Sequence, residues 1–182
     1  MARLFVAIHP PRATTVALLE ALGEVEGLPE HRVTPPHRMH LTVLFVGEVE
    51  PRDLERCAES VERAASGVRA FELHPQTLIT LPQSGAARLI AAGVDGCSDL
   101  SELRKRLAQR LSSARRRERT FLPHLTLCRF PRPTDFTVEE RLFELAPFAV
   151  DEVALMESRT TPGGNEYCLV TRVGLPRARK GR

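Results

Sequence analysis

The sequence predicts an α+β fold with largely antiparallel sheets. Strand-type segments stand in groups between helical segments, instead of alternating with them one by one as in a parallel sheet. The chain has 182 residues, of which 42% are hydrophobic and 27% charged, so it is long enough for one apolar core and ordinary in composition for a globular protein. We expect a single domain over residues 1–175, followed by a basic flexible tail over 176–182.

In the first half of the chain, short apolar runs predict strands, and apolar residues spaced three and four apart predict helices. One helix is marked by its proline start, and another by Leu54, Cys57 and Val61 on a single face. The expected elements are a strand at 3–8, a helix at 10–25, a short strand at 31–34, a strand at 39–49, a helix at 50–66, and strands at 69–81 and 87–95.

In the second half, the clearest helical pattern of the chain covers residues 98–113, where Leu100, Leu103, Leu107 and Leu111 form one apolar stripe. The letters TTPGGN before the last strand are typical of a hairpin turn. The elements expected after the helix are a strand at 121–130, a proline-rich loop at 131–136, a short helix at 137–145, and strands at 148–158 and 165–173.

The tripeptide His-Leu-Thr occurs twice, and both copies follow soon after a proline at the start of a predicted strand. Because successive side chains of a strand alternate between its faces, His40 and Thr42 share one face, as do His124 and Thr126. The leucines between them point the other way, into a core. Two such strands brought together would line a groove with two imidazoles and two hydroxyls.

This set of groups suits the hydrolysis of a phosphodiester, above all a strained cyclic one. Since the imidazole pKa is about 6.5, one histidine can be neutral and take a proton from water while the other is protonated and gives a proton to the leaving oxygen. The threonine hydroxyls can donate hydrogen bonds to the phosphate oxygens. The alternative is a pair of ordinary half-buried histidines, but a second identical tripeptide arises by chance on the order of a few per cent of the time.

The tetrapeptides HLTV at 40–43 and HLTL at 124–127 resemble the paired H-x-[TS]-x motifs of the two-histidine (2H) phosphoesterase superfamily. Their surroundings narrow the resemblance. The segments RLFVAI, PPHRMHLTVLFVGEV, RTFLPHLTLCR, VDEVALMESR and YCLVTRVGL are similar to the RNA 2′,3′-cyclic phosphodiesterase family of bacteria and archaea, whose members are also named 2′-5′ RNA ligases. The resemblance covers nearly the whole chain before the basic tail.

The resemblance implies a bilobal fold with pseudo-two-fold symmetry, in which two mainly antiparallel sheets line a central cleft and the helices lie outside. It implies metal-independent hydrolysis of RNA 2′,3′-cyclic phosphate ends to a 2′-phosphate without a cofactor, and in some members ATP-independent 2′-5′ joining of RNA ends. The expected partners are RNA ends or 2′,3′-cyclic nucleotides, and the expected state is a monomer. A ligase as the main role, and a non-catalytic module that binds RNA ends or nucleotides, are the alternatives.

Carried over to this chain, the resemblance makes His40 and His124 the acid–base pair and Thr42 and Thr126 the phosphate ligands. A first assignment has His40 protonating the ribose 3′-oxygen and His124 activating water, and the sequence does not fix this direction. Arg129 matches a phosphate-binding arginine of the family. It stands five residues after His124, however, so strict alternation would place it on the opposite face unless the strand bulges or ends there.

Two aromatic residues are candidates for nucleoside binding. Phe45 stands five residues after His40, and could stack on a base or lie in the core. Tyr167 matches an aromatic residue of the family near the cleft, and an ordinary strand position is its alternative. Cys128 is expected on the face of Thr126, without a chemical role. The other histidines are expected in loops or at the surface, and among them only His37 is close enough to His40 to border the groove.

The remaining features bear on charge and location. The net charge of +3 and the pI of about 8.9 permit an anionic partner, and Arg119 is the member of a basic cluster nearest to the second motif. No apolar run approaches the roughly 20 residues of a membrane-spanning helix, and the first ten residues are too poor in apolar positions for a secretory signal. The four cysteines lack a C-x-x-C pair, which favours reduced thiols in the cytoplasm over a disulfide framework or a zinc site.

Overall fold

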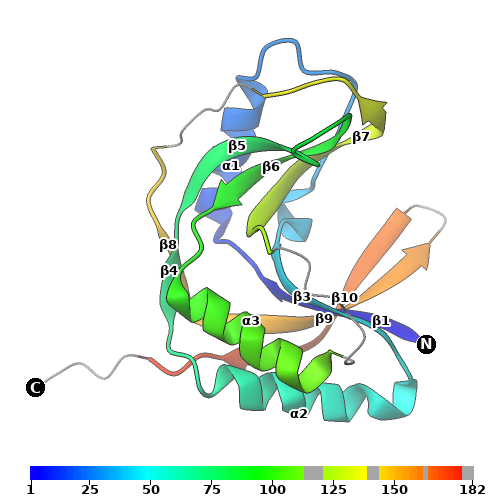
Figure 1. Ribbon diagram of the computed structural model, residues 1–182, viewed down its shortest axis with the longest axis vertical. Helices are drawn as coiled ribbons and strands as arrows, with labels where there is room; N and C mark the ends of the chain where they lie inside the picture. The colour runs from blue at the N-terminus through cyan, green and yellow to red at the C-terminus, as the bar shows by residue number, and fades with distance from the viewer. Residues whose placement is uncertain (113–120, 139–143, 162–163, 178–182) are drawn as a thin grey trace, which may run out of the picture.

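An eight-stranded antiparallel sheet runs through both lobes of the molecule in the computed structural model, which describes residues 1–112, 121–138, 144–161 and 164–177 (Figure 1). The strand order is β10-β9-β1-β3-β7-β6-β5, with β2 paired to β7. The first lobe contains β1 (Ala2–Ile8), β3 (Leu41–Val49), β9 (Glu152–Thr161) and β10 (Gly164–Gly174). The second lobe contains β2 (Arg32–Val33), β5 (Pro75–Leu81), β6 (Ala87–Val94) and β7 (His124–Thr134).

The lobes meet where β3 lies beside β7. Within the described residues, a single pair joins these strands, Leu41 with Leu125, and both side chains are fully buried. On either side of this pair the strands diverge, so each lobe keeps its own half of the sheet. The predicted α+β fold with two mainly antiparallel sheets is confirmed, with the addition that this one pair connects the two sheets.

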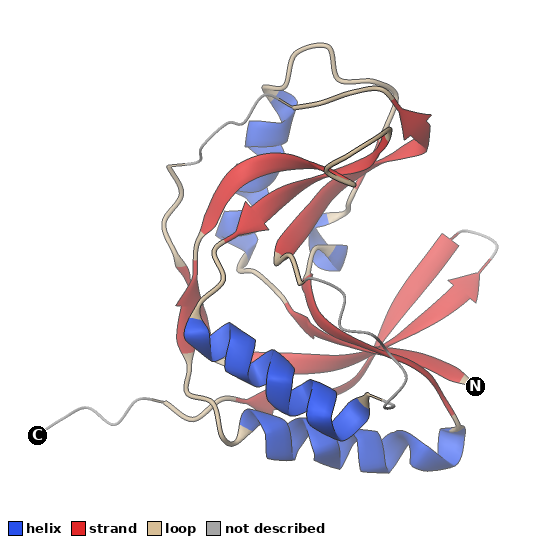
Figure 2. Ribbon diagram, in the orientation of Figure 1, coloured by secondary structure: helices blue, strands red, loops and turns tan. Residues whose placement is uncertain are grey.

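Each lobe sends a helix to the other. Helix α1 (Arg12–Gly23) follows β1 of the first lobe but packs on β7 of the second, whereas α3 (Ser98–Leu111) follows β6 of the second lobe and packs on β3 of the first. Helix α2 (Leu54–Ala65) lies beside α3 and covers β9 and β10 (Figure 2). This reciprocal exchange gives the molecule its pseudo-two-fold symmetry. We call the side of the sheet that faces away from the helices and the core the inner face.

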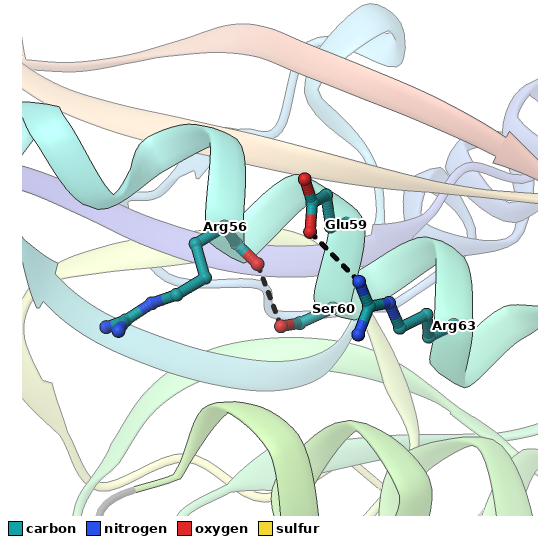
Figure 3. A network of polar contacts seen from close by, with 4 residues as sticks. All are labelled: Arg56, Glu59, Ser60 and Arg63. Carbon is teal, nitrogen blue, oxygen red and sulfur yellow. Dashed lines mark hydrogen bonds and ion pairs between the residues drawn. The ribbon is translucent and has the colours of Figure 1, made fainter.

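The outer surface of α2 is polar and lies away from the inner face. Figure 3 shows two contacts there: the Ser60 hydroxyl donates to the Arg56 carbonyl over 2.8 Å, and Arg63 pairs with Glu59 over 3.2 Å. The opposite side of α2 buries Cys57 and Val61 of the predicted face together with Ala64 and Ala65, whereas Leu54 is only partly buried. Exposed pairs one helical turn apart contribute only about 0.3–0.5 kcal/mol each, so the buried side holds the helix in place.

Two predicted strands are each divided in the structure. The segment 69–81 forms β4 (Phe71–Leu73) and then β5, with the division at His74, and the segment 148–158 forms β8 (Phe148–Val150) and then β9. In both cases the chain leaves the small sheet that β4 and β8 make with each other and enters the main sheet. Backbone hydrogen bonds hold the second crossing, where the Asp151 carbonyl accepts from the amide of Leu175 over 2.7 Å.

Two expectations for the segment after the second motif have different outcomes. The predicted proline-rich loop at 131–136 is wrong for its first four residues, because β7 continues to Thr134 and pairs there with Ala87 of β6. Prolines are tolerated at this end of β7 because, among the described residues, it has a neighbouring strand on one side only. The predicted short helix at 137–145 falls mostly on 139–143, outside the described residues, as do 162–163 of the TTPGGN turn and 178–182 of the predicted tail.

The hydrophobic core is continuous between the lobes. Buried side chains of β1 and β3 belong to the same cluster as those of β6, β7 and the helices α1, α2 and α3. Leu100, Leu103 and Leu107 of the predicted stripe are fully buried. A second, smaller cluster lies on the inner face of the first lobe and consists of Phe5, Ala7, Ala154 and Met156, with Tyr167 packed against it. None of the helices within the described ranges has the length and apolar character needed to cross a membrane.

Candidate active site

The two His-Leu-Thr segments meet at the junction of the lobes. The pair formed by Leu41 and Leu125 is antiparallel, so the same register extended by one residue sets His40 beside Thr126 and His124 beside Thr42. Side chains opposite one another in such a pair have Cβ atoms about 4.5–5.5 Å apart. Since both leucines point into the core, all four polar side chains lie on the inner face. The structure therefore brings the two predicted imidazoles and the two predicted hydroxyls together.

The two imidazoles are held in the same way. Nδ1 of His40 lies 2.7 Å from the carbonyl oxygen of Arg38, and Nδ1 of His124 lies 2.8 Å from that of Leu122, two residues earlier in each case. A carbonyl oxygen only accepts hydrogen bonds, so Nδ1 must carry the proton in both rings. The free nitrogen of each ring is then Nε2, which is an acceptor in the neutral form and a donor in the protonated form. Each backbone bond thus fixes both the tautomer and the orientation of its ring.

Two matching β-bulges decide which later residues face inward. In β3 the register against β1 shifts so that Val43 has no partner, and in β7 the register against β6 shifts so that Leu127 has none. Each bulge stands three residues after its histidine and reverses the alternation of side chains beyond it. Residues five positions after the histidines therefore return to the inner face.

Arg129 is placed on the inner face by the second bulge. It pairs with Leu89 of β6, and its charge is close enough to affect the pKa of His40. The same shift corrects the expectation for Cys128, which does not share a face with Thr126 and is fully buried in the core. Arg129 is exposed and forms no ion pair with any described residue, so its guanidinium is available to an anion.

The first bulge places Phe45 on the inner face in the same manner. Phe45 is 64% exposed, which excludes the core position, and its ring lies 6.3 Å from the ring of Phe5. Phe5 in turn lies 5.1 Å from the His40 ring and 5.2 Å from the Tyr167 ring. Tyr167 also contacts His40 directly, edge to face at 5.2 Å. The three aromatic side chains thus form a continuous floor on one side of His40.

The threonine hydroxyls are available as well. Thr42 and Thr126 are both half-buried, and within the described part of the chain no hydrogen bond engages either hydroxyl. A hydroxyl can donate one hydrogen bond and accept two, so each can bind a phosphate oxygen without breaking an internal contact. The predicted phosphate ligands are therefore free to act on a group held between the imidazoles.

The electrostatics of the site act most strongly on His40. Burial of the ring is the main cause that lowers the pKa of His40 from 6.5 to about 4. The hydrogen bond to the Arg38 carbonyl opposes this shift, whereas the positive charges of His9, Arg129 and His124 add to it. His40 is consequently neutral at neutral pH when the site is empty. An anion bound between these groups would raise the pKa of His40 again.

Two residues of the site escaped the sequence reasoning. His9, expected at the surface without a role, follows β1 directly, and its ring lies 6.0 Å from that of His40. Arg32 of β2 pairs with Arg129, and paired residues share a face, so a second guanidinium reaches the inner face. The signal for His9 was its position at the end of a strand, but nothing in the sequence shows that this strand lies next to β3. Arg119 lies outside the described residues.

A pocket of about 210 Å³ has His40 in its lining and, among the described residues, none of β7. His9 and the loop residues His37 and Arg38 line one part of it, and Phe5 and Met156 line another. The edge strand β10 contributes Glu166, Tyr167 and Cys168. His37, expected to border the groove, is thus placed beside His40 in this pocket.

This chain is similar to known proteins in sequence and in fold. The family model for the 2′-5′ RNA ligase superfamily matches residues 10–162. The RNA 2′,3′-cyclic phosphodiesterase of Thermus thermophilus is 30% identical, in an alignment that covers 99% of this chain and 93% of the relative.

Solved structures similar to this chain have the same fold. The crystal structure of TT0787 of Thermus thermophilus superposes with a TM-score of 0.81 at 28% identity and covers 95% of this chain and 97% of its own. E. coli LigT complexed with 3′-AMP superposes with a TM-score of 0.77 at 23% identity, over 96% of this chain and 98% of its own, and supports the fold alone.

Proposed function

Because this chain belongs to the 2′-5′ RNA ligase superfamily, we propose that it is an RNA 2′,3′-cyclic phosphodiesterase, which opens the cyclic phosphate at an RNA end to leave a 2′-phosphate. The curated relative reported above carries that activity in its name. The single observation that best supports the proposal is the meeting of two identically held imidazoles, His40 and His124, at the junction of the lobes. The reaction needs one proton acceptor and one proton donor, and this site offers both.

In the proposed reaction, one imidazole takes a proton from water through its free Nε2 as the water oxygen attacks the phosphorus. The bond from phosphorus to the ribose 3′-oxygen breaks in line with this attack, and the other imidazole gives its proton to that oxygen. The product is a 2′-phosphate and a 3′-hydroxyl. Thr42, Thr126 and Arg129 bind the non-bridging oxygens, where negative charge grows in the transition state. In this proposal the protein's own side chains carry every step.

The test is hydrolysis of 2′,3′-cyclic AMP in the presence of a chelator, with identification of the product isomer. We expect turnover in EDTA and 2′-AMP as the product, because protonation of the 3′-oxygen leaves the phosphate on the 2′ position. Activity that appears only after a divalent metal is added would contradict the metal-independent mechanism. Formation of 3′-AMP would show that the leaving oxygen is the other one.

The direction of proton transfer has a separate test. We propose His40 as the acid, which gains its proton when the anionic phosphate raises its lowered pKa, and His124 as the base. An aryl phosphodiester such as bis(4-nitrophenyl) phosphate has a leaving group that needs no protonation. His40→Ala should therefore lose far less activity on the aryl diester than on 2′,3′-cyclic AMP, whereas His124→Ala should lose as much on both. The reverse pattern would exchange the two roles.

Joining of RNA ends is the second candidate, favoured by the description of the family model that matches this chain. Here the 5′-hydroxyl of one RNA end would take the place of water and attack the phosphorus of a 2′,3′-cyclic end. The bond to the ribose 3′-oxygen would break as in hydrolysis, so a 2′-5′ phosphodiester forms in the same site without ATP. Incubation of these two RNA ends should then yield a longer product that contains a 2′-5′ bond. A product seen only at very high concentrations of ends would favour hydrolysis as the main activity.

We propose RNA ends and 2′,3′-cyclic nucleotides as the partners, a cytoplasmic location and a monomer. All four cysteines are free thiols, which suits a reducing compartment. Light scattering of the purified protein should give the mass of one chain, 20.3 kDa. A mass of twice this value would contradict the monomer.

A further inference from the structure

The pocket beside His40 has His40 itself in its lining but extends away from His124 and the two threonines, none of which lines it. Three side chains that carry or can acquire positive charge, His9, His37 and Arg38, lie along it. The volume of about 210 Å³ is smaller than the roughly 300–1,000 Å³ of pockets that enclose whole ligands. The pocket therefore suits one group of a substrate rather than a whole nucleotide.

The described lining of this pocket holds one guanidinium, one carboxylate, and two imidazoles in addition to that of His40. Arg38 forms no ion pair with any described residue. The rings of His9 and His37 each carry an N–H group that can donate a hydrogen bond. Glu166 is the carboxylate of the lining. Arg159, opposite it on β9, pairs with Glu157 over 2.7 Å, and Glu166 is only the smallest of the influences on the pKa of Arg159. The pKa of His9 is lowered, first by burial and then by the charge of Arg172, although Glu152 opposes this. An anion in the pocket would favour the protonated form of His9 and so raise its pKa.

We propose that His9, His37 and Arg38 form a second phosphate subsite, which holds the phosphodiester that links the terminal nucleotide to the rest of an RNA chain. This inference rests on the proposed function, because it takes the terminal cyclic phosphate to lie between His40 and His124. The linking phosphate is attached through the 5′-oxygen of the same ribose, one sugar away. The ring centroids of His9 and His40 are 6.0 Å apart, so the second subsite lies directly beside the first.

The subsite gives the protein a preference for RNA ends over free cyclic nucleotides. A mononucleotide without a 5′-phosphate leaves the pocket without an anion, whereas any longer RNA fills it. Because the contacts go to phosphate and not to a base, the preference is independent of the sequence of the RNA. The aromatic floor of Phe5 and Tyr167 borders the ribose between the two phosphates.

Binding of product analogues tests the subsite without turnover. The probes are adenosine 2′-phosphate, and an adenosine dinucleotide with the same terminal 2′-phosphate, measured by calorimetry at low salt. We expect the dinucleotide to bind roughly 10- to 100-fold more tightly, as hydrogen bonds to a charged group allow. A dinucleotide with a neutral methylphosphonate linkage should lose this advantage on the wild-type protein. Arg38→Ala and His9→Gln should each reduce the ratio of the two dissociation constants.

Arg56→Ala is the matched control, because Arg56 is an exposed arginine of α2, which covers β9 and β10 on the side opposite the inner face. It should leave the ratio as in the wild type. Equal affinity for the dinucleotide and the mononucleotide would overturn the subsite. Tighter binding of the dinucleotide that persists with the methylphosphonate linkage would also overturn it, since the contacts would then be made to the second sugar or base. Because binding is measured, a protein that binds the dinucleotide more tightly but hydrolyses no cyclic phosphate keeps the subsite and loses the proposed function.

Discussion

His40 is the residue whose surroundings are most specialised. Its Nδ1 is fixed by a backbone carbonyl, its ring is enclosed by Phe5 and Tyr167, and its pKa is lowered to about 4. The imidazole of His40 therefore stays neutral next to several positive groups as long as no anion is bound between them. A buried imidazole of this kind lowers the free energy of unfolding of the empty protein at acid pH, and this effect can be measured.

The lowered pKa of His40 predicts a loss of stability in acid. In the unfolded chain the imidazole takes up a proton near pH 6.5, but in the folded protein it does so only near pH 4. The unfolded state therefore binds more protons between these values, and the free energy of unfolding falls as the pH drops from about 6.5 to about 4. The full shift corresponds to about 3 kcal/mol.

Urea unfolding at several pH values, on the wild type and on His40→Gln, measures this contribution. The difference in unfolding free energy between the two proteins should change in favour of the variant as the pH falls through this range. A constant difference would mean that the pKa of His40 is close to that of a free imidazole.

At the scale of elements, the junction of β3 with β7 positions the site. Leu41 and Leu125 lie between the histidine and the threonine of each strand and point into the shared core, so their packing fixes both pairs of polar side chains on the inner face. The bulges at Val43 and Leu127 then bring Phe45 and Arg129 to the same face. One leucine pair and two bulges thus account for the arrangement of all the residues predicted to act on phosphate.

Leu125→Ala should destabilise the protein by about 2–5 kcal/mol, since it leaves a cavity at a fully buried position. It should also reduce catalysis, because the imidazoles on either side of the junction lose their support. Urea unfolding and a hydrolysis assay of the same preparation measure both effects. The control is Glu59→Ala, which removes an exposed ion pair of α2 and should change stability by less than about 0.5 kcal/mol. Similar small losses in both variants would show that the junction is not a point of support.

The sequence predicts the positions of these helices and strands better than the interruptions within the strands. Hydrophobic periodicity locates α1, α2, α3 and the longer strands of the main sheet, because one face of each of these elements is buried, whereas both residues of β2 are exposed. It misses the divisions at His74 and Asp151. At His74 the alternation of buried and exposed positions continues unchanged, whereas at the second division it shifts by one residue, because Asp151 and Glu152 are both exposed. The bulges also escape it, because an extra residue in a strand leaves no mark in composition. Arg129 could therefore be assigned from its family resemblance but not from the strand pattern.

At the scale of the whole molecule, the exchange of helices makes each lobe depend on the other. Helix α1 belongs in sequence to the first lobe but covers β7, and α3 belongs to the second but covers β3. One hydrophobic cluster includes buried side chains from both lobes. Neither half of the sheet would keep its covering helix if the other half unfolded. We propose on this basis that residues 1–175 form a single folding unit.

Thermal or urea unfolding should consequently show one cooperative transition. Circular dichroism, which reports on helices and strands throughout the chain, should give the same midpoint as the fluorescence of Tyr167, which reports on the inner face of the first lobe. Two separated transitions, or different midpoints from the two signals, would mean that the lobes unfold independently.

The most direct test of the acid–base pair compares kcat/KM for 2′,3′-cyclic AMP in the wild type, His40→Ala, His124→Ala and the double variant, with His31→Ala as control. His31 has the same Nδ1 bond to a carbonyl two residues earlier, but does not line the pocket beside His40. Each single variant should lose at least about 10²–10⁴-fold, and the double variant should be no slower than the slower single one, because proton donor and acceptor act together. A single variant close to wild-type activity, or a double variant that loses the product of both single losses, would contradict a coupled pair.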